Sequence, residues 1–101
     1  DYLYCHHRSH GYYLAKKGNL NELISELYGK ETGANRGFAG SQDISSSQNN
    51  FYAGAILSGS VGIAVGTAFS KKYNKDNSIK GQLISICSNF FNCEIIGIRL
   101  I

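Results

Sequence analysis

All three histidines of this chain lie in one short segment, Cys5–Gly11, with the sequence CHHRSHG. The same seven residues include Cys5 and Arg8. Imidazole nitrogens and a thiolate are the usual protein ligands of zinc, whereas an arginine guanidinium among polar neighbours binds phosphate groups. The segment therefore predicts either a metal site or an anion site, and the rest of the sequence has to distinguish them.

Length and composition predict one small domain at most. The chain has 101 residues, with no methionine and no proline, and we expect it to be a single fragment, residues 1–101, trimmed at least at the front. The net charge of +3 comes from scattered basic residues, so we expect no nucleic-acid partner. Three cysteines without CxxC spacing argue against a disulfide framework and a classical zinc module, and predict a reducing, cytoplasmic compartment.

The elements around the histidine segment follow from local patterns. Residues 1–5 predict a strand that leads into a loop carrying the histidines, and residues 12–17 predict a helical turn. Asn19 is a helix cap that precedes Glu22, and apolar residues then recur at helical spacing: Leu20, Leu23, Ile24 and Leu27. That helix is expected to end at Gly29, and its apolar stripe is expected to lie in the core or at an interface. Residues 30–50 predict a loop, which is either a mobile connector or a cover over a ligand.

Residues 51–69 form an uncharged run that is followed by Lys71 and Lys72. One interpretation is a membrane-spanning helix whose packing face contains Gly62 and Gly66. The other is a buried helix packed against a sheet, with residues 54–60 forming a turn that brings backbone amides near a ligand. Beyond it, residues 79–87 and 94–101 predict two strands, and the continuous apolar residues 95–98 are typical of a strand covered on both faces.

The order of these pieces resembles a known family. The strings HHRSHGYYLAKKGNLNELISELYGKETGANRG, FAGS and NFYAGAILSGSVGIAVGTAFSKKY look like the alpha subunit (E1 alpha) of thiamine-diphosphate-dependent 2-oxo acid dehydrogenases. The resemblance covers residues 1–78 and leaves residues 79–101 as a divergent tail. It implies an α/β fold, part of a doubly wound thiamine-diphosphate-binding domain with mostly parallel strands. It also implies oxidative decarboxylation of a 2-oxo acid, with transfer of the acyl group to a lipoyl group.

The resemblance also implies roles for individual residues. Arg8 takes the position that holds the cofactor diphosphate, beside His7 near the cofactor, and His10 takes that of the active-site histidine, where an imidazole can relay a proton. Ala55 and Leu57 take positions where the backbone meets the aminopyrimidine and an apolar side chain supports the bent cofactor. The implied partners are an E1 beta subunit, in an alpha2beta2 heterotetramer, and a lipoyl-bearing E2. This interpretation argues against a membrane location. At Cys5–Gly11 it favours an anion site over a metal site.

The sequence departs from the family in the motifs that hold the metal. The family requires Mg²⁺ bound by a GDG motif and by an NN pair that follows it. This chain has no GDG motif, and therefore no NN pair after one. The family motif GGSMH is replaced by AGSQD at residues 39–43, and the family proline before the buried helix is replaced by Gly62. We therefore expect an incomplete chain without activity of its own. The tail is explained equally by an internal deletion or by a shifted reading frame.

Overall fold

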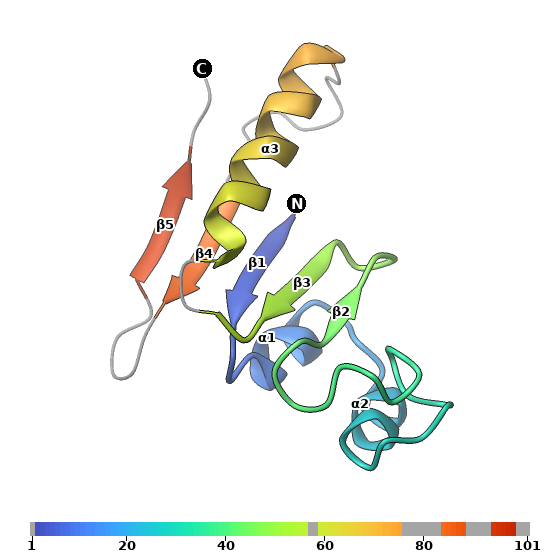
Figure 1. Cartoon of the computed structure of the whole chain (residues 1–101). Helices are drawn as coiled ribbons and strands as arrows, with labels where there is room; N and C mark the ends of the chain where they lie inside the picture. The colour runs from blue at the N-terminus through green and yellow to red at the C-terminus, as the bar shows by residue number, and fades with distance from the viewer. Residues whose placement is uncertain (1, 57–58, 76–83, 89–93, 99–101) are drawn as a thin grey trace.

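A mixed five-stranded sheet forms the centre of the molecule (Figure 1). The computed structural model describes residues 2–56, 59–75, 84–88 and 94–98. The strand order is β2 (Ser45–Ser46), β3 (Phe51–Gly54), β1 (Leu3–His6), β4 (Ile84–Ser88) and β5 (Glu94–Ile98). β1 lies parallel to both β3 and β4, so the first strand of the chain occupies the middle of the sheet.

The resemblance implied a mostly parallel sheet, but only half of the strand pairings in the described sheet are parallel. β2 and β3 pair antiparallel, and so do β4 and β5. In both cases the connection between the strands, residues 47–50 and 89–93, is too short for the crossover that a parallel pair requires. The two parallel pairings are joined by long connections that contain the helices.

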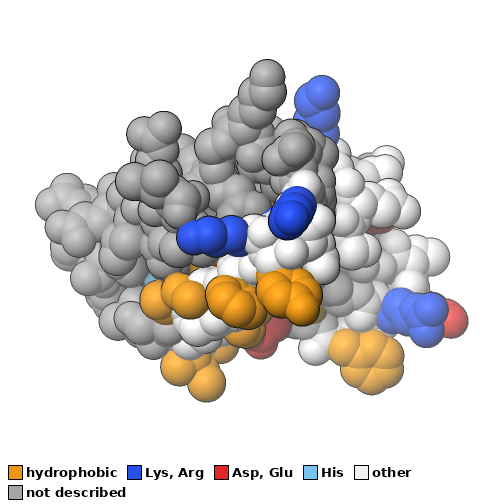
Figure 2. Space-filling model, turned by 90° about the horizontal axis from the view of Figure 1, so that it is seen from above, with side chains coloured by type: hydrophobic (Ala, Val, Ile, Leu, Met, Phe, Trp, Pro, Cys, Tyr) orange, Lys and Arg blue, Asp and Glu red, His pale blue; other side chains and the backbone are white. Residues whose placement is uncertain are grey.

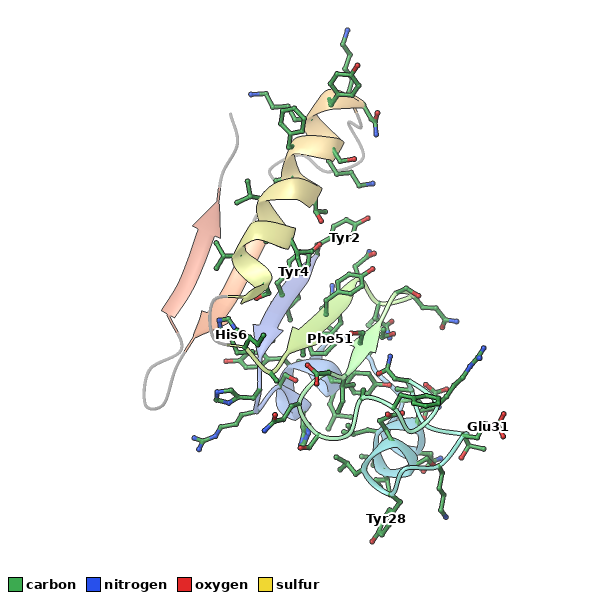
Figure 3. All side chains as sticks on the ribbon, in the orientation of Figure 1. Tyr2, Tyr4, His6, Tyr28, Glu31 and Phe51 are labelled. Carbon is green, nitrogen blue, oxygen red and sulfur yellow. The ribbon has the colours of Figure 1, made fainter. Side chains whose placement is uncertain are left out.

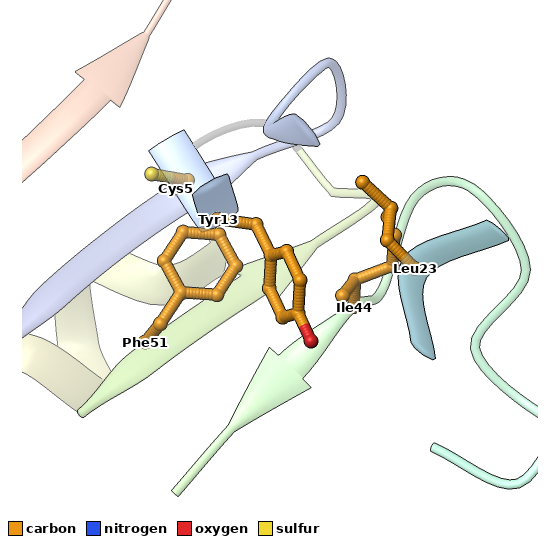
Figure 4. Packing of buried hydrophobic residues seen from close by; sticks show 5 residues of the cluster. All are labelled: Cys5, Tyr13, Leu23, Ile44 and Phe51. Carbon is orange, nitrogen blue, oxygen red and sulfur yellow. The ribbon is translucent and has the colours of Figure 1, made fainter. Parts of the chain in front are cut away.

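Alternate residues of the sheet face two different layers. Cys5 and Phe51 point to the side that carries α1 (His10–Ala15) and α2 (Leu20–Leu27), where they form a core with Tyr13, Leu23 and Ile44 (Figure 4). The rings of Tyr13 and Phe51 meet edge to face, with centroids 5.7 Å apart. This arrangement suits aromatic quadrupoles and links α1 directly to β3.

On the opposite face, the sheet packs against α3 (Gly59–Tyr73). Tyr4 lies against Ala64 and Ala68, and its hydroxyl shares a hydrogen bond with Thr67. The small alanines let the helix approach the ring closely. Burial raises the pKa of the Tyr4 hydroxyl, which therefore stays protonated near neutral pH.

The two interpretations of residues 51–69 are thereby resolved. The run does not form one helix, because Phe51–Gly54 is a strand and α3 begins only at Gly59. Within the described residues no helix is both long and apolar enough to cross a membrane. The single helix over residues 51–69 that the first interpretation requires is therefore not formed, and α3 packs against a sheet as the second interpretation predicted.

The other elements follow the sequence patterns with shifted boundaries. The first strand and the two C-terminal strands are present as β1, β4 and β5; residues 79–83 and 99–101 of the predicted strands lie outside the described part. The helical turn is α1, which begins two residues early. β2 is a two-residue strand within the predicted loop, and β5 lies at the edge of the described sheet.

The cap of α2 matches the sequence prediction. The Asn19 side chain accepts hydrogen bonds from the backbone N–H groups of Asn21, at 2.9 Å, and of Glu22, at 3.4 Å. These N–H groups have no acceptor within the first turn of a helix.

We expect Asn19→Ala to lower the free energy of unfolding by about 1 kcal/mol, because it removes this acceptor. Urea denaturation of the chain measures the change. Asn21→Ala is the control, since Asn21 is exposed on the same helix and its loss should change stability by less than about 0.5 kcal/mol. Equal stability of the two variants would show that the cap contributes nothing.

Candidate functional site

The candidate site lies at the carboxyl ends of β1 and β3. His6 is the last residue of β1 and pairs with Gly54 at the end of β3, as the position of His6 in Figure 3 illustrates. The chain leaves β1 towards β3 and later crosses to β4 on the other side of β1. In open α/β sheets, ligands bind outside the carboxyl ends of the strands where such a reversal occurs.

A cavity of about 520 Å³ opens at this edge. It is lined by the side chains of His7, Arg8, His10, Ser41 and Gln42. Three residues predicted from the histidine segment therefore meet the loop that the sequence offered as a possible cover. The cavity joins positions more than thirty residues apart in the chain.

Arg8 has an unusual backbone conformation for an arginine. Its φ angle is 66°, in the left-handed region that residues other than glycine rarely adopt. Such residues cost free energy and concentrate at functional sites. The turn places Arg8, an exposed residue, in the lining of the cavity, where its positive charge suits an anionic ligand.

His10 is held by the loop across the cavity. Its Nε2 lies 2.9 Å from the carbonyl oxygen of Ser41. A carbonyl oxygen only accepts hydrogen bonds, so Nε2 carries the proton, and in the neutral ring Nδ1 is the basic nitrogen. The ring can therefore exchange a proton through Nδ1 while Nε2 anchors it.

The two positions predicted near the aminopyrimidine are only partly described. Leu57 lies outside the described residues. The backbone N–H of Ala55 donates to Oδ1 of Asp43 at 2.8 Å, so the carbonyl oxygen is the backbone group of Ala55 that a ligand could contact. Asp43 is the last residue of the AGSQD segment, and no local pattern predicted that it would join the loop to the end of β3.

We expect Asp43→Ala to accelerate hydrogen exchange of the Ala55 amide about tenfold, because a charge-assisted hydrogen bond of more than about 1 kcal/mol is lost. Amide exchange followed by NMR measures this. Ala53 is the control within the same variant, since its N–H donates to the carbonyl oxygen of Ile44 at 3.1 Å. Unchanged exchange at Ala55 would contradict the role given to Asp43.

Glu26 is the main residue that sequence reasoning missed. It lies on α2 and is fully buried, where it accepts hydrogen bonds from three backbone N–H groups of the following loop. The donors are Asn35 and Gly37, at 2.7 and 2.8 Å from Oε2, and Ala39, at 2.7 Å from Oε1.

The same hydrogen bonds decide the ionisation of Glu26. Burial by itself raises the pKa of this carboxyl, but the backbone N–H groups of Gly37, Asn35, Ala39 and Gly40 outweigh burial, so the pKa lies below its ordinary value. Glu26 is thus a buried carboxylate. The signal that could have revealed it is the glycine-rich loop itself, whose amides need an internal acceptor.

The apolar stripe of α2 is not the face that packs into the core. Leu23 is buried, but Leu20, Ile24 and Leu27 remain about half exposed. The prediction that these residues form a core or an interface is therefore confirmed as core only for Leu23. The buried face consists of Leu23 and Glu26.

Cys5 lies away from the cavity. Its side chain is 1% exposed within the core, and burial raises the pKa of the thiol to about 11. Zinc binding needs a thiolate that converges with imidazoles, and no group of three or more His, Cys, Asp or Glu side chains comes together within the described residues. The thiol of Cys5 therefore belongs to the core and not to the lining of the cavity.

Comparison with known proteins identifies the family. Residues 1–84 match the family described as dehydrogenase E1 component. Over 74 residues the chain is 35% identical to the mitochondrial pyruvate dehydrogenase E1 component subunit alpha-1 of Arabidopsis thaliana. The matched segment is 72% of this chain and 19% of that protein. Over 76 residues it is 37% identical to the pyruvate dehydrogenase E1 component subunit alpha of Porphyra purpurea, covering 74% of this chain and 22% of the relative.

The chain thus spans about a fifth of the length of these relatives. A further relative, the chloroplastic pyruvate dehydrogenase E1 component subunit alpha-3 of Arabidopsis thaliana, is 37% identical over 71 residues, which are 69% of this chain and 17% of that protein. The names include mitochondrial and chloroplastic proteins, so a cytoplasmic location stays a prediction.

Proposed function

Because the chain belongs to the dehydrogenase E1 component family, we propose that it forms the diphosphate-binding part of a thiamine-diphosphate-dependent E1 alpha subunit. The reaction of the whole enzyme would be oxidative decarboxylation of a 2-oxo acid, with acyl transfer to a lipoyl group. The observation that carries the proposal is the cavity at the end of β1, where His7, Arg8 and His10 meet the loop at Ser41 and Gln42.

The fold supports this placement. Helices lie on both faces of the sheet, and β1 separates β3 from β4. This is the arrangement from which a doubly wound domain is built. We propose that residues 1–78 are part of such a domain, with residues 79–101 as its divergent tail.

The side chains at the cavity fit the anionic end of the cofactor. Arg8 offers planar, paired N–H donors that match diphosphate oxygens, and His7 adds a second polar group beside it. Ala55, and Leu57 by resemblance, would contact the aminopyrimidine end. A GDG motif followed by an NN pair, which would bind Mg²⁺, does not occur in these 101 residues, so the proposal gives this chain only the diphosphate side.

His10 would serve as the proton-handling residue. With Nε2 bound to Ser41, Nδ1 accepts or returns a proton at the reacting centre. When bound, thiamine diphosphate supplies the carbanion-stabilising group that loss of CO₂ requires. The chain's own part is to bind the diphosphate, orient His10 and move this proton.

The surface supports a partner subunit. In the view from above, hydrophobic side chains gather beside lysine and arginine side chains (Figure 2). The exposed apolar residues of α3 are Ile63, Val65, Phe69 and Tyr73. Apolar residues concentrated on one helix are typical of an interface, and we propose an E1 beta subunit as the partner, with a lipoyl-bearing E2 receiving the acyl group.

Calorimetric titration with thiamine diphosphate and Mg²⁺, in the presence of a beta subunit, tests this function. We expect saturable binding, and Arg8→Ala should weaken it about tenfold to hundredfold because a charge-assisted contact is lost. Lys17→Ala is the matched control, since Lys17 is an exposed cation with φ of 65° outside the cavity. Absence of binding heat from the unmodified chain would reduce the proposal to common ancestry.

A further inference from the structure

The loop that faces His10 contains no helix or strand of its own. Residues 28–44 connect α2 to β2, and four of them have left-handed backbone conformations: Gly29, Arg36, Gly37 and Gly40. Such a loop keeps one shape when its backbone groups find partners, and backbone hydrogen bonds such as that from the Ala34 N–H to the Glu22 carbonyl oxygen supply some of them. Glu26 does so for Asn35, Gly37 and Ala39.

The part held by Glu26 is directly continuous with the part that holds His10. Ala39 donates its N–H to Glu26, and two residues later the carbonyl oxygen of Ser41 accepts the hydrogen bond from His10. Between them Gly40 has φ of 59°, which turns the chain so that one side faces α2 and the other faces the cavity. The carboxylate of Glu26 thus holds the loop two residues before the Ser41 carbonyl.

Steric contacts tighten this arrangement. A Cβ atom at Gly33 would lie only 2.6 Å from Cα of Glu26, a backbone atom that cannot move aside cheaply. The loop thus folds back directly onto the helix at Glu26.

We propose that Glu26 is a positioning residue that fixes the ring of His10 through the Ala39–Ser41 segment. The value of this for catalysis rests on the proposed function, since it assumes that His10 is the residue that moves the proton. The positioning itself is a property of the chain without cofactor. Removing the carboxylate releases the Ser41 carbonyl and leaves the His10 ring free to reorient.

The test is NMR of the cofactor-free chain with ¹⁵N-labelled histidine. We expect a protected Nε2–H signal for His10 in the unmodified chain. In Glu26→Gln its exchange with water should be at least about tenfold faster, as for any hydrogen bond that contributes about 1.4 kcal/mol. Glu22→Gln is the matched control, because it removes the same charge from the exposed side of the same helix and should leave the signal unchanged.

A second variant separates positioning from loss of the fold. Glu26→Asp keeps the carboxylate but shortens it by one methylene, so it should give intermediate exchange at His10 while the ring signals of Tyr13 and Phe51 in the core stay in place. If a folded Glu26→Gln or Glu26→Asp chain keeps the full protection of His10, the proposal is overturned. This readout needs no thiamine diphosphate, so it can succeed where the titration of the proposed function fails.

Discussion

Phe51→Ala is expected to lower the free energy of unfolding by about 3–5 kcal/mol, measured by urea or thermal denaturation. Phe51 is fully buried and lies where β3 meets the helices of one face. Its ring contacts a core that includes Cys5 from β1 and Tyr13 from α1. Removing the ring leaves a cavity that these elements cannot fill without moving apart, and a loss of this size is a large part of the stability of a small domain.

Phe38 provides the matched control for this substitution. It is a phenylalanine of the same chain but is 91% exposed, so Phe38→Ala should change the free energy of unfolding by less than about 0.5 kcal/mol. A loss below about 1 kcal/mol for Phe51→Ala would mean that β3 and α1 are not held together through this ring.

Local patterns were enough to predict the pieces that depend on neighbouring residues. Asn19 caps α2 because its side-chain oxygen reaches the first-turn amides, and that geometry is contained in a few consecutive positions. The end of β1 at the histidine segment was predictable for the same reason. The resemblance added the expectation that His7, Arg8 and His10 share one site, and the cavity brings these three together.

Features that depend on distant residues were not predictable in this way. The pattern of α2 indicated a buried apolar stripe, but the loop that folds over this helix brings backbone amides, so the buried position belongs to Glu26 and not to Ile24 or Leu27. Likewise, the uncharged run after Asn50 divides into strand and helix because Phe51–Gly54 pairs with β1. Hydropathy alone does not contain that pairing.

The stability of the chain should fall steeply in acid because of Glu26. Its pKa is lower in the folded chain than its ordinary value, so the unfolded chain binds a proton at a higher pH than the folded one. Glu26 therefore contributes its stability fully above the unfolded pKa of about 4.3 and loses it as the pH falls through the lower folded pKa. Within that window the slope reaches at most about 1.4 kcal/mol per pH unit for this one group.

Glu26→Gln isolates this contribution. The amide keeps one acceptor oxygen but turns N–H donors towards the remaining loop amides, so we expect a loss of about 2 kcal/mol at pH 7. Urea denaturation at several pH values measures the free energy of unfolding. Between pH 5 and the folded pKa this free energy should fall less for the variant than for the unmodified chain, so that the two curves of stability against pH converge in acid. Glu22→Gln, with its exposed carboxylate on the same helix, should keep the acid dependence of the unmodified chain. Parallel curves for the unmodified chain and Glu26→Gln would show that the buried carboxylate is not the group that acid protonates. The shape of the loop would then be attributed to Asn35 and Asp43, whose side chains accept hydrogen bonds from the backbone N–H groups of Ser45 and Ala55.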